Sequence, residues 1–169
     1  EAMVAQGLEV TDFGMASPPA MFMATVTDGY NYDGTVMITA SHLPFNRNGL
    51  KFFTREGGLE GADITEILTY AQDGYTCSPK KPGEVKTFDY LSRYAEQIAG
   101  IIKKGTGLDK PFAGMKIAVD AGNGAGGFYA TDVLEKLGAD IAGSQFLDPD
   151  GRFPNHIPNP EDEKAMEAI

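Results

Sequence analysis

The order of segments in the last third of the chain restricts the fold most strongly. Residues 115–121 form a short apolar run, residues 122–128 a glycine-rich turn, residues 129–139 a helical pattern, and residues 140–146 a second apolar run. A strand, a turn, a helix and a strand in this order are typical of α/β proteins, in which helices cover a sheet. We therefore predict the α/β class for this part of the chain.

The first half contains segments of the same kinds. We expect strands at residues 8–15, 34–40 and 50–54, and helices at residues 16–29, 62–74 and 87–105. The run at 34–40 is short, apolar and β-branched, which favours a strand buried on both faces. The last helix carries five apolar residues at helical spacing on one face, namely Tyr90, Leu91, Tyr94, Ile98 and Ile101. The α/β class is therefore expected for both halves.

A short segment with the composition of a linker separates the two halves. It covers residues 105–112 and contains the glycine and proline residues that interrupt regular structure. We therefore predict a first domain over residues 1–104 and a second over residues 113–169. The chain opens on the end of a helix and closes on the start of another, so we expect it to be a fragment of a longer protein.

The net charge of the chain argues against some classes of partner, and its single cysteine indicates a cellular compartment. The formal net charge is -10 and the pI about 4.6, whereas nucleic acids and anionic membranes both carry phosphate. Neither is expected as a partner, and no apolar run approaches the length of a membrane span. Cys77 has no second cysteine to pair with, which fits the reducing cytoplasm. We interpret Cys77 as an isolated thiol. The sequence carries no signal about oligomeric state.

The glycine-rich turn matches the spacing of a dinucleotide-binding fingerprint. Gly122, Gly124 and Gly127 follow an expected strand and precede an expected helix, as such a fingerprint requires. The acidic residue that would bind the ribose could only be Asp148. It lies slightly too far along the chain for this role and stands in a proline-rich loop. We favour a tight turn that needs glycine for its backbone freedom, and keep a dinucleotide-dependent oxidoreductase as the lesser alternative.

The segment after the last expected strand holds oxygen ligands and a histidine. Asp148 and Asp150 have the look of a cation loop, but the glutamate that closes a Ca²⁺ loop is missing. We interpret both aspartates as turn-capping residues. His156 has no partner at metal-ligand spacing, so we expect an exposed or packed histidine.

The loop between the expected strands at 34–40 and 50–54 concentrates reactive groups. Ser41 and His42 end the first strand, and Lys51 returns after the turn at Asn48–Gly49. A hydroxyl, an imidazole and an ammonium group in one place suit phosphoryl chemistry, as nucleophile, proton-transfer group and countercharge. The same residues also fit a plain turn with a solvated histidine and a strand-edge lysine. On composition alone both interpretations stay open.

The same loop resembles the active-site loop of the α-D-phosphohexomutases, the phosphoglucomutase/phosphomannomutase family. That loop reads T-A-S-H-N-P, a short spacer, then N-G-x-K. The matching positions here are Thr39, Ala40, Ser41, His42, Pro44, Asn48, Gly49 and Lys51. Residues 7–22, 116–127 and 149–161 resemble further stretches of the family, in the correct order. The resemblance therefore covers nearly the whole chain.

This resemblance implies a fold and a reaction. The fold would be a pair of three-layer α/β/α sandwich domains with mixed, mostly parallel sheets, the second domain incomplete. Ser41 would be a phosphoserine that exchanges its phosphoryl group with hexose phosphates through a 1,6-bisphosphate, interconverting the 1- and 6-phosphates. Mg²⁺ would bind a phosphoserine oxygen, glucose 1,6-bisphosphate would serve as activator or intermediate, and His42 and Lys51 would act in proton transfer or charge stabilisation. Four further residues would shape the loop, namely Thr39, Pro44, Asn48 and Gly49.

The chain departs from the family pattern in ways that bear on activity. Leu43 replaces the usual asparagine of the loop, and the aspartate-rich metal loop D-G-D-G-D-R does not occur. The third and fourth domains and the start of the first are also expected to be missing, so the chain alone should be at best a very poor mutase. Thr39 favours phosphoglucomutase/phosphomannomutase over the phosphoglucosamine mutase branch. A non-catalytic α/β module that binds an anion at this loop is the alternative from another class.

Overall fold

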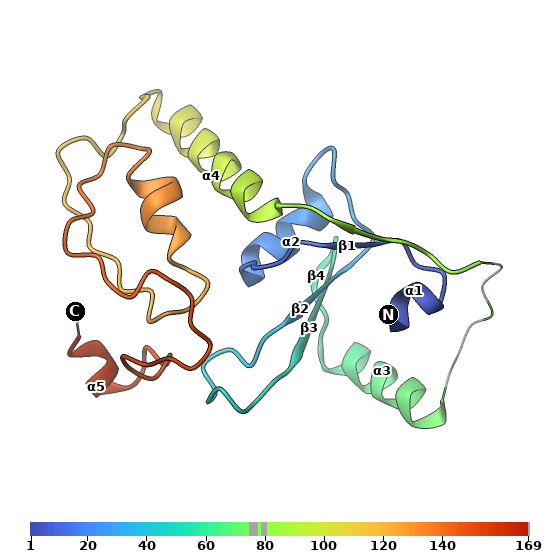
Figure 1. Cartoon of the computed structure of the whole chain (residues 1–169). Helices are drawn as coiled ribbons and strands as arrows, with labels where there is room; N and C mark the ends of the chain where they lie inside the picture. The colour runs from blue at the N-terminus through green and yellow to red at the C-terminus, as the bar shows by residue number, and fades with distance from the viewer. Residues whose placement is uncertain (75–77, 79–80, 169) are drawn as a thin grey trace.

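The computed structural model describes residues 1–74, 78 and 81–168, and Cys77 lies outside these residues. Figure 1 shows two halves joined by one long helix, α4 (Tyr90–Thr106). The other helices are α1 (Ala2–Ala5), α2 (Pro18–Val26), α3 (Gly61–Asp73), the π-helical η1 (Tyr129–Leu134) and α5 (Glu163–Met166). None of the helices in the described residues is long and apolar enough to cross a membrane.

The strands of the first half form two small sheets. β1 (Val10–Asp12) pairs in parallel with β5 (Val85–Thr87). β2 (Thr35–Ile38), β3 (Leu50–Thr54) and β4 (Gly57–Gly58) form an antiparallel sheet in that order. Helices and mixed sheets together confirm the α/β class. Among the described strands, one pair is parallel and two are antiparallel.

The expected strand at 34–40 is shorter and more exposed than predicted. Among the described strands, β2 is the edge strand of its sheet and pairs only with β3, so the prediction of burial on both faces is wrong. Ile38 is 66% exposed, while Thr35 is buried. One face of the β2–β3 ribbon therefore packs on the core and the other stays open, as in half-buried antiparallel sheets.

The two expected strands of the second half lie side by side but stay irregular. Parallel bridges link Lys116 to Asp140 and Asp120 to Gln145. Between them the Val119 N–H donates to the Ser144 hydroxyl, 3.0 Å away. Side chains that bond to backbone groups in this way compete with a regular strand ladder. The expected helix at 129–139 is the six-residue η1 followed by turns.

Local signals in the sequence place the helix ends. Ser17 caps α2, which begins with two prolines, and Asp89 caps α4 through the Ser92 N–H at 3.1 Å. Gly107 ends α4 in the left-handed conformation at φ 70°. The helix thus runs into the segment 105–112 that we predict as a linker, and the division into domains stays a prediction.

The core runs through α4 and reaches both halves. In the first half Tyr90 is fully buried and stacks on Phe13 at a centroid distance of 4.8 Å. One turn further on, Ala95 packs with Val133 and Leu137 of the second half. Because one helix is buried on both sides, it fixes how the first half sits against the second. The predicted apolar face is confirmed at Tyr90 but ends before Ile101, which is 64% exposed.

We expect Leu137→Ala to destabilise the protein by about 2–5 kcal/mol, because Leu137 is fully buried in the cluster that α4 shares with the second half. Leu68→Ala is the matched control, since Leu68 on α3 is 57% exposed, and should cost less than about 0.5 kcal/mol. Urea unfolding of the two variants measures both. Equal losses would contradict the assignment of the core.

Candidate active site

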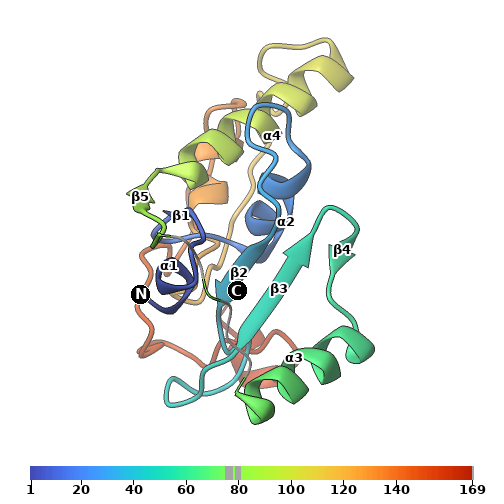
Figure 2. The same ribbon diagram turned by 90° about the vertical axis from the view of Figure 1, so that its right-hand side faces the viewer.

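A hairpin positions the loop that joins β2 to β3. Ile38 pairs with Leu50, and the Thr39 N–H donates to the Gly49 carbonyl at 2.9 Å, which extends the pairing by one residue. A Cβ atom on Gly49 would lie 2.9 Å from the Thr39 carbonyl oxygen, so only glycine fits here. Figure 2 shows the loop projecting from the end of the β2–β3 ribbon. The sequence therefore builds a short, pinned hairpin with an exposed loop.

Ser41 adopts an unusual backbone conformation within this loop. Its φ is 58°, in the left-handed region that residues other than glycine rarely occupy. The Ser41 N–H donates to the Thr39 hydroxyl at 3.0 Å, and this contact holds the conformation. Strained residues of this kind are concentrated at functional sites. The serine is exposed, so its hydroxyl is accessible.

The structure places the other two predicted reactive residues near the serine loop but outside its cavity. Lys51 pairs with Met37, and Met37 packs on the core, so Lys51 lies on the same face of the ribbon as the core. His42 follows Ser41 directly. Both side chains are exposed, and neither forms an ion pair in the part of the chain that the structure describes. The Lys51 charge is therefore available to an anion.

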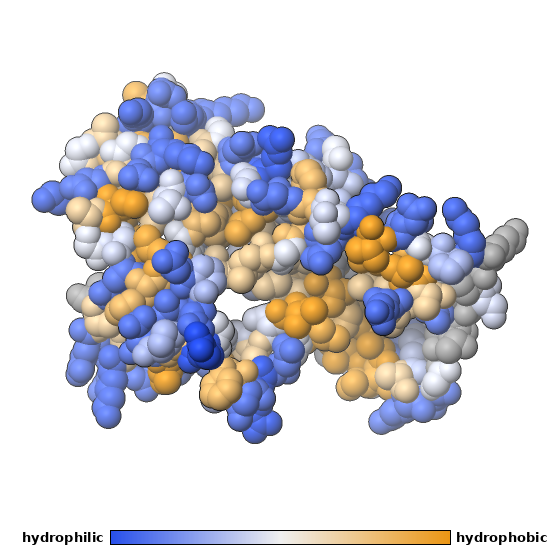
Figure 3. Space-filling view, viewed as in Figure 1, coloured by the Kyte–Doolittle hydropathy of each residue, from blue (hydrophilic) through white to orange (hydrophobic). Residues whose placement is uncertain are grey.

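A cavity of about 360 Å³ lies between the serine loop and the second half. Thr39 and Ser41 line it from the first half; the glycine-rich turn, residues 153–160 and α5 line it from the second. The space-filling view shows the surface opened between the two halves (Figure 3). Pockets of this size accommodate small organic ligands. Ser41 is therefore brought together with residues more than 75 positions away in sequence.

The backbone N–H groups of the glycine-rich turn donate to acceptors within the protein. Those of Gly122, Asn123 and Gly124 donate to the Asp120 carboxylate, the Phe146 carbonyl and the Ala121 carbonyl. A phosphate-binding turn must instead point such groups at its ligand. A Cβ atom on Gly127 would collide with the Leu147 carbonyl oxygen. These contacts favour the tight-turn interpretation over dinucleotide binding.

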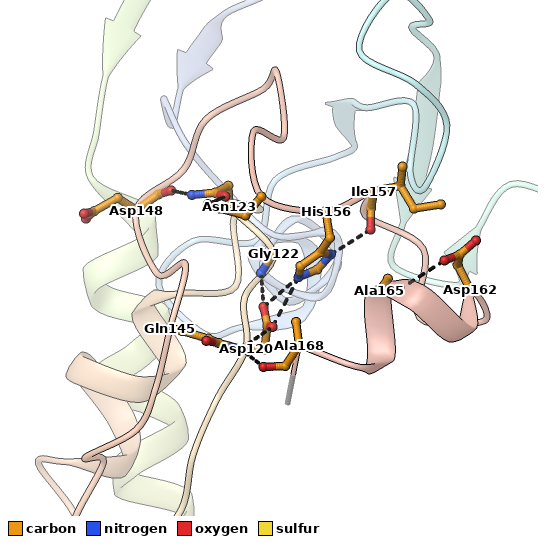
Figure 4. Close-up of polar contacts among 11 residues, drawn as sticks. Asp120, Gly122, Asn123, Gln145, Asp148, His156, Ile157, Asp162, Ala165 and Ala168 are labelled. Atoms are coloured by element: carbon orange, nitrogen blue, oxygen red, sulfur yellow. Dashed lines mark hydrogen bonds and ion pairs between the residues drawn. The ribbon is translucent and has the colours of Figure 1, made fainter.

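Sequence reasoning missed the most buried charged residue of the cavity, Asp120. Its side chain is 4% exposed and that of His156 is 17% exposed. The His156 Nε2 atom lies 3.1 Å from Oδ1 and 3.2 Å from Oδ2 of Asp120 (Figure 4). The sequence left open whether His156 is exposed or packed; the structure shows it packed, with a partner 36 positions earlier. The one available signal was an aspartate at the end of an expected strand.

The contacts of this pair shift both pKa values toward the charged forms. The hydrogen bond to the Ile157 carbonyl, followed by the Asp120 carboxylate, raises the pKa of His156. Burial acts to raise the pKa of Asp120, but donation from Gly122, His156 and Gln145 together lowers it. Both shifts favour the carboxylate form of Asp120 and the imidazolium form of His156.

Asp150 of the next loop caps a turn, as predicted. Asp150 accepts the Arg152 N–H at 2.9 Å and pairs with its guanidinium, which lowers the pKa of Asp150 to about 2. The Asp148 carbonyl accepts the Asn123 side-chain amide at 2.9 Å. Across residues 1–74, 78 and 81–168, no three His, Cys, Asp or Glu side chains gather as they would around a metal ion.

The sequence matches two family models, one for each half of the chain. The sequence matches the family described as "Phosphoglucomutase/phosphomannomutase, alpha/beta/alpha domain I" over residues 1–76 and the corresponding "domain II" over residues 92–169. The second match starts inside α4. Together the two matches cover most of the chain.

Individual relatives of the chain carry the same family name. The chain is 36% identical to a phosphoglucomutase of Neisseria meningitidis over 164 residues, covering 96% of this chain and 33% of that protein. It is 33% identical to a phosphomannomutase/phosphoglucomutase of Pseudomonas putida, covering 100% and 34%. A crystal structure of a phosphoglucomutase/phosphomannomutase family protein from Burkholderia thailandensis matches with a TM-score of 0.82 and 28% identity, covering 98% and 35%. The chain thus spans about a third of the length of these relatives.

The fold and the site define an α/β protein with an exposed, backbone-strained serine at the mouth of a cavity between two halves. The matches to both domain families and to the relatives identify it further. The chain belongs to the phosphoglucomutase/phosphomannomutase family.

The charged pair predicts a pH-dependent contribution to stability. Because the folded pKa of His156 is raised above 6.5, the stabilisation is complete below about pH 6.5 and is lost as pH rises through the folded pKa. Because the folded pKa of Asp120 is lowered, the stabilisation is also lost at acid pH, below about 3.8. We expect the stability difference between wild type and His156→Gln, measured by urea unfolding, to shrink from pH 5.5 to pH 8.5.

Arg152→Gln is the control for this measurement. Arg152 and Asp150 both stay charged from pH 5.5 to pH 8.5, because the pKa of Asp150 is about 2 and that of Arg152 is raised. Its effect should therefore be constant over this range. A difference for His156→Gln that grows with pH would contradict the charged-pair assignment.

Proposed function

We propose that this chain is part of a phosphohexomutase, in which Ser41 carries a phosphoryl group between hexose 1-phosphates and hexose 6-phosphates. The observation that carries the proposal is Ser41 itself, held at φ 58° by Thr39 and lining the cavity between the halves. A left-handed serine on a pinned loop presents its hydroxyl to a ligand in that cavity. Family membership supplies the reaction class, and the partner is a phosphosugar.

The proposed reaction moves one phosphoryl group at a time. Phosphorylated Ser41 gives its phosphoryl group to the free 6-hydroxyl of a hexose 1-phosphate, whose proton leaves to a base, and a 1,6-bisphosphate forms. The bisphosphate then turns in the site, and its 1-phosphoryl group returns to the Ser41 oxygen, which leaves a hexose 6-phosphate. The phosphoryl group and the protons balance over the cycle. Glucose 1,6-bisphosphate enters this scheme as the intermediate and as the activator that phosphorylates Ser41.

His42 and Lys51 take the supporting roles in this proposal. Both are exposed beside the serine loop, and the Lys51 ammonium has no ion-pair partner among the described residues. A cation near a transferring phosphoryl group stabilises the charge that develops in the transition state. An adjacent imidazole or amine suits proton transfer to and from the sugar hydroxyl. Thr39, Pro44, Asn48 and Gly49 shape the loop that presents them.

Mg²⁺ belongs to the proposal as a family expectation. It prefers oxygen ligands, and a phosphate oxygen on Ser41 would supply one; when bound, it would neutralise phosphoryl charge. The described residues do not gather a set of metal ligands around Ser41, so they do not by themselves fit a metal centre. No step above is therefore routed through the metal.

The cytoplasm is the proposed compartment, because a single cysteine and an acidic net charge fit a soluble metabolic enzyme.

Two alternatives to this function remain. A non-catalytic anion-binding module is the alternative from another class, and the phosphoglucosamine mutase branch is the alternative within the family. Phosphorylation of Ser41 distinguishes the proposal from the anion-binding module, and the sugar phosphate that is accepted distinguishes it from the phosphoglucosamine branch.

The first test is the covalent state of Ser41. Parent-length protein is stripped of phosphate, incubated with glucose 1,6-bisphosphate and analysed by intact mass. We expect a gain of one phosphoryl group, and no gain in Ser41→Ala. The control is Ser78→Ala, a serine remote in sequence on the loop after α3, which should be phosphorylated as wild type.

The outcomes separate the hypotheses. Binding of the bisphosphate without any mass gain favours an anion-binding module. Covalent labelling by glucosamine 1,6-bisphosphate with none by the glucose compound assigns the phosphoglucosamine branch. A protein that neither binds nor takes phosphate would overturn the proposal.

We expect Lys51→Met to reduce turnover of the parent enzyme by about 100-fold or more, because one charge-stabilising group at a transition state has this effect. The melting temperature should change by less than about 2 °C, because Lys51 is exposed. Lys86→Met, on the exposed strand β5, is the matched control and should retain turnover. A Lys51→Met protein that melts much lower yet turns over normally when folded would exclude the catalytic role.

A further inference from the structure

The cavity wall contributed by the second half is organised around one buried carboxylate. Asp120 Oδ1 accepts the Gly122 N–H at 2.7 Å, and Oδ2 accepts the Gln145 side-chain amide at 3.0 Å (Figure 4). His156 Nε2 contacts both carboxylate oxygens at 3.1 and 3.2 Å. A carboxylate that is 4% exposed is unfavourable unless donors surround it, and these donors satisfy it.

His156 is held at both ring nitrogens. Nδ1 lies 2.9 Å from the Ile157 carbonyl oxygen, which can only accept, so Nδ1 carries a proton. Nε2 faces the Asp120 carboxylate, which also accepts, so Nε2 carries a proton as well. The ring also packs edge-on against Phe146 at a centroid distance of 5.6 Å. With both nitrogens engaged, His156 cannot exchange a proton with a ligand without breaking one contact. It is suited to fix a structure rather than to act as a base.

The contacts of Asp120 connect three separate segments. Through Gly122 they hold the glycine-rich turn, and through His156 they hold the loop at 153–160. Gln145 donates to Asp120 and also to the Ala168 carbonyl, which ties down the segment that follows α5. The glycine-rich turn, the loop at 153–160 and α5 line the cavity that Ser41 lines from the first half. The charged pair therefore joins two parts of the wall across from Ser41, the glycine-rich turn and the loop at 153–160.

We propose that Asp120 and His156 are positioning residues for phosphoryl transfer at Ser41. They set the distance and orientation between Ser41 and a phosphosugar held against the wall formed by the second half. This inference rests on the proposed function and assigns it two residues outside the serine loop. A displacement of reacting groups by about 1 Å costs on the order of 100-fold in rate, so loss of the pair should act on the rate of transfer more than on binding of the donor.

The test uses the dephosphorylated parent-length protein and glucose 1,6-bisphosphate as donor. Single-turnover phosphorylation of Ser41 is followed by quenched intact-mass analysis over a range of donor concentrations. Asp120→Asn and His156→Gln keep the size of the side chains and remove the charge pair. We expect each to lower the maximal transfer rate about tenfold or more, with the half-saturating donor concentration changed less than about threefold.

Asp150→Asn is the matched control. It removes a carboxylate from another ion pair of the same loop, with Arg152, whose 82% exposed side chain lies outside the cavity. We expect this variant to transfer at the wild-type rate. The rates are compared per folded molecule, using the folded fraction from thermal unfolding of each variant, because a purely structural loss would disappear in that comparison.

Two further variants test that the residues act as a pair. The double variant Asp120→Asn/His156→Gln should be no slower than the slower single variant, since coupled residues are non-additive. His156→Gln should transfer faster than His156→Ala, because glutamine restores one N–H donor. If Asp120→Asn fails to fold, the comparison of the two His156 variants decides alone.

The outcomes distinguish this inference from the function on which it rests. Transfer by Asp120→Asn and His156→Gln at the rate of Asp150→Asn would overturn the positioning role, while wild-type labelling of Ser41 leaves the mutase proposal intact. The same holds if the two losses equal the loss of folded protein. An unsubstituted protein that takes no phosphate would overturn the proposed function and this inference together.

Discussion

The packing of α4 against both halves is the constraint on which the rest of the structure depends. Its first turns bury Tyr90 and Tyr94 in the aromatic cluster with Phe13, and Ala95 packs with Val133 and Leu137 of the second half. A helix buried on both sides cannot tilt without disturbing two clusters at once, because protein interiors are close-packed. The glycine-rich turn ends at Phe128, which packs against both clusters. Its position relative to the first half is therefore tied to α4.

Each side of the cavity has its own local device for holding backbone in place. On the first side, the Thr39 hydroxyl and the close approach of Gly49 stabilise a left-handed serine. On the second, Asp120 and His156 draw the glycine-rich turn and the following loop together. Both devices use short polar contacts close to the point where chemistry is proposed. This arrangement is what preorganised sites require, since positioned groups need not reorganise during reaction.

Sequence reasoning was most accurate where the determinants are local. The helix expected at 62–74 is α3 (Gly61–Asp73), which ends at the left-handed Gly74, because a glycine stop acts within one turn of the chain. β3 was predicted with its observed bounds. The least accurate prediction was burial of the strand at 34–40 on both faces, because burial depends on neighbours elsewhere in the chain. In the second half, Ser144 and Asp140 divert backbone N–H groups from the expected ladder, a competition that apolar periodicity does not reveal.

The sequence by itself determined the α/β class, the serine loop and the family, because these depend on segment order and on residues spaced within a dozen positions. The roles of Ser41, His42 and Lys51 came with that resemblance and remain proposals. Only the tertiary structure decided that Ser41 shares a cavity with the second half and that His156 is paired with Asp120. Those two facts join residues 36 or more positions apart. The packing of α4 against both halves sets Ser41 beside the second half, and no local pattern encodes that packing.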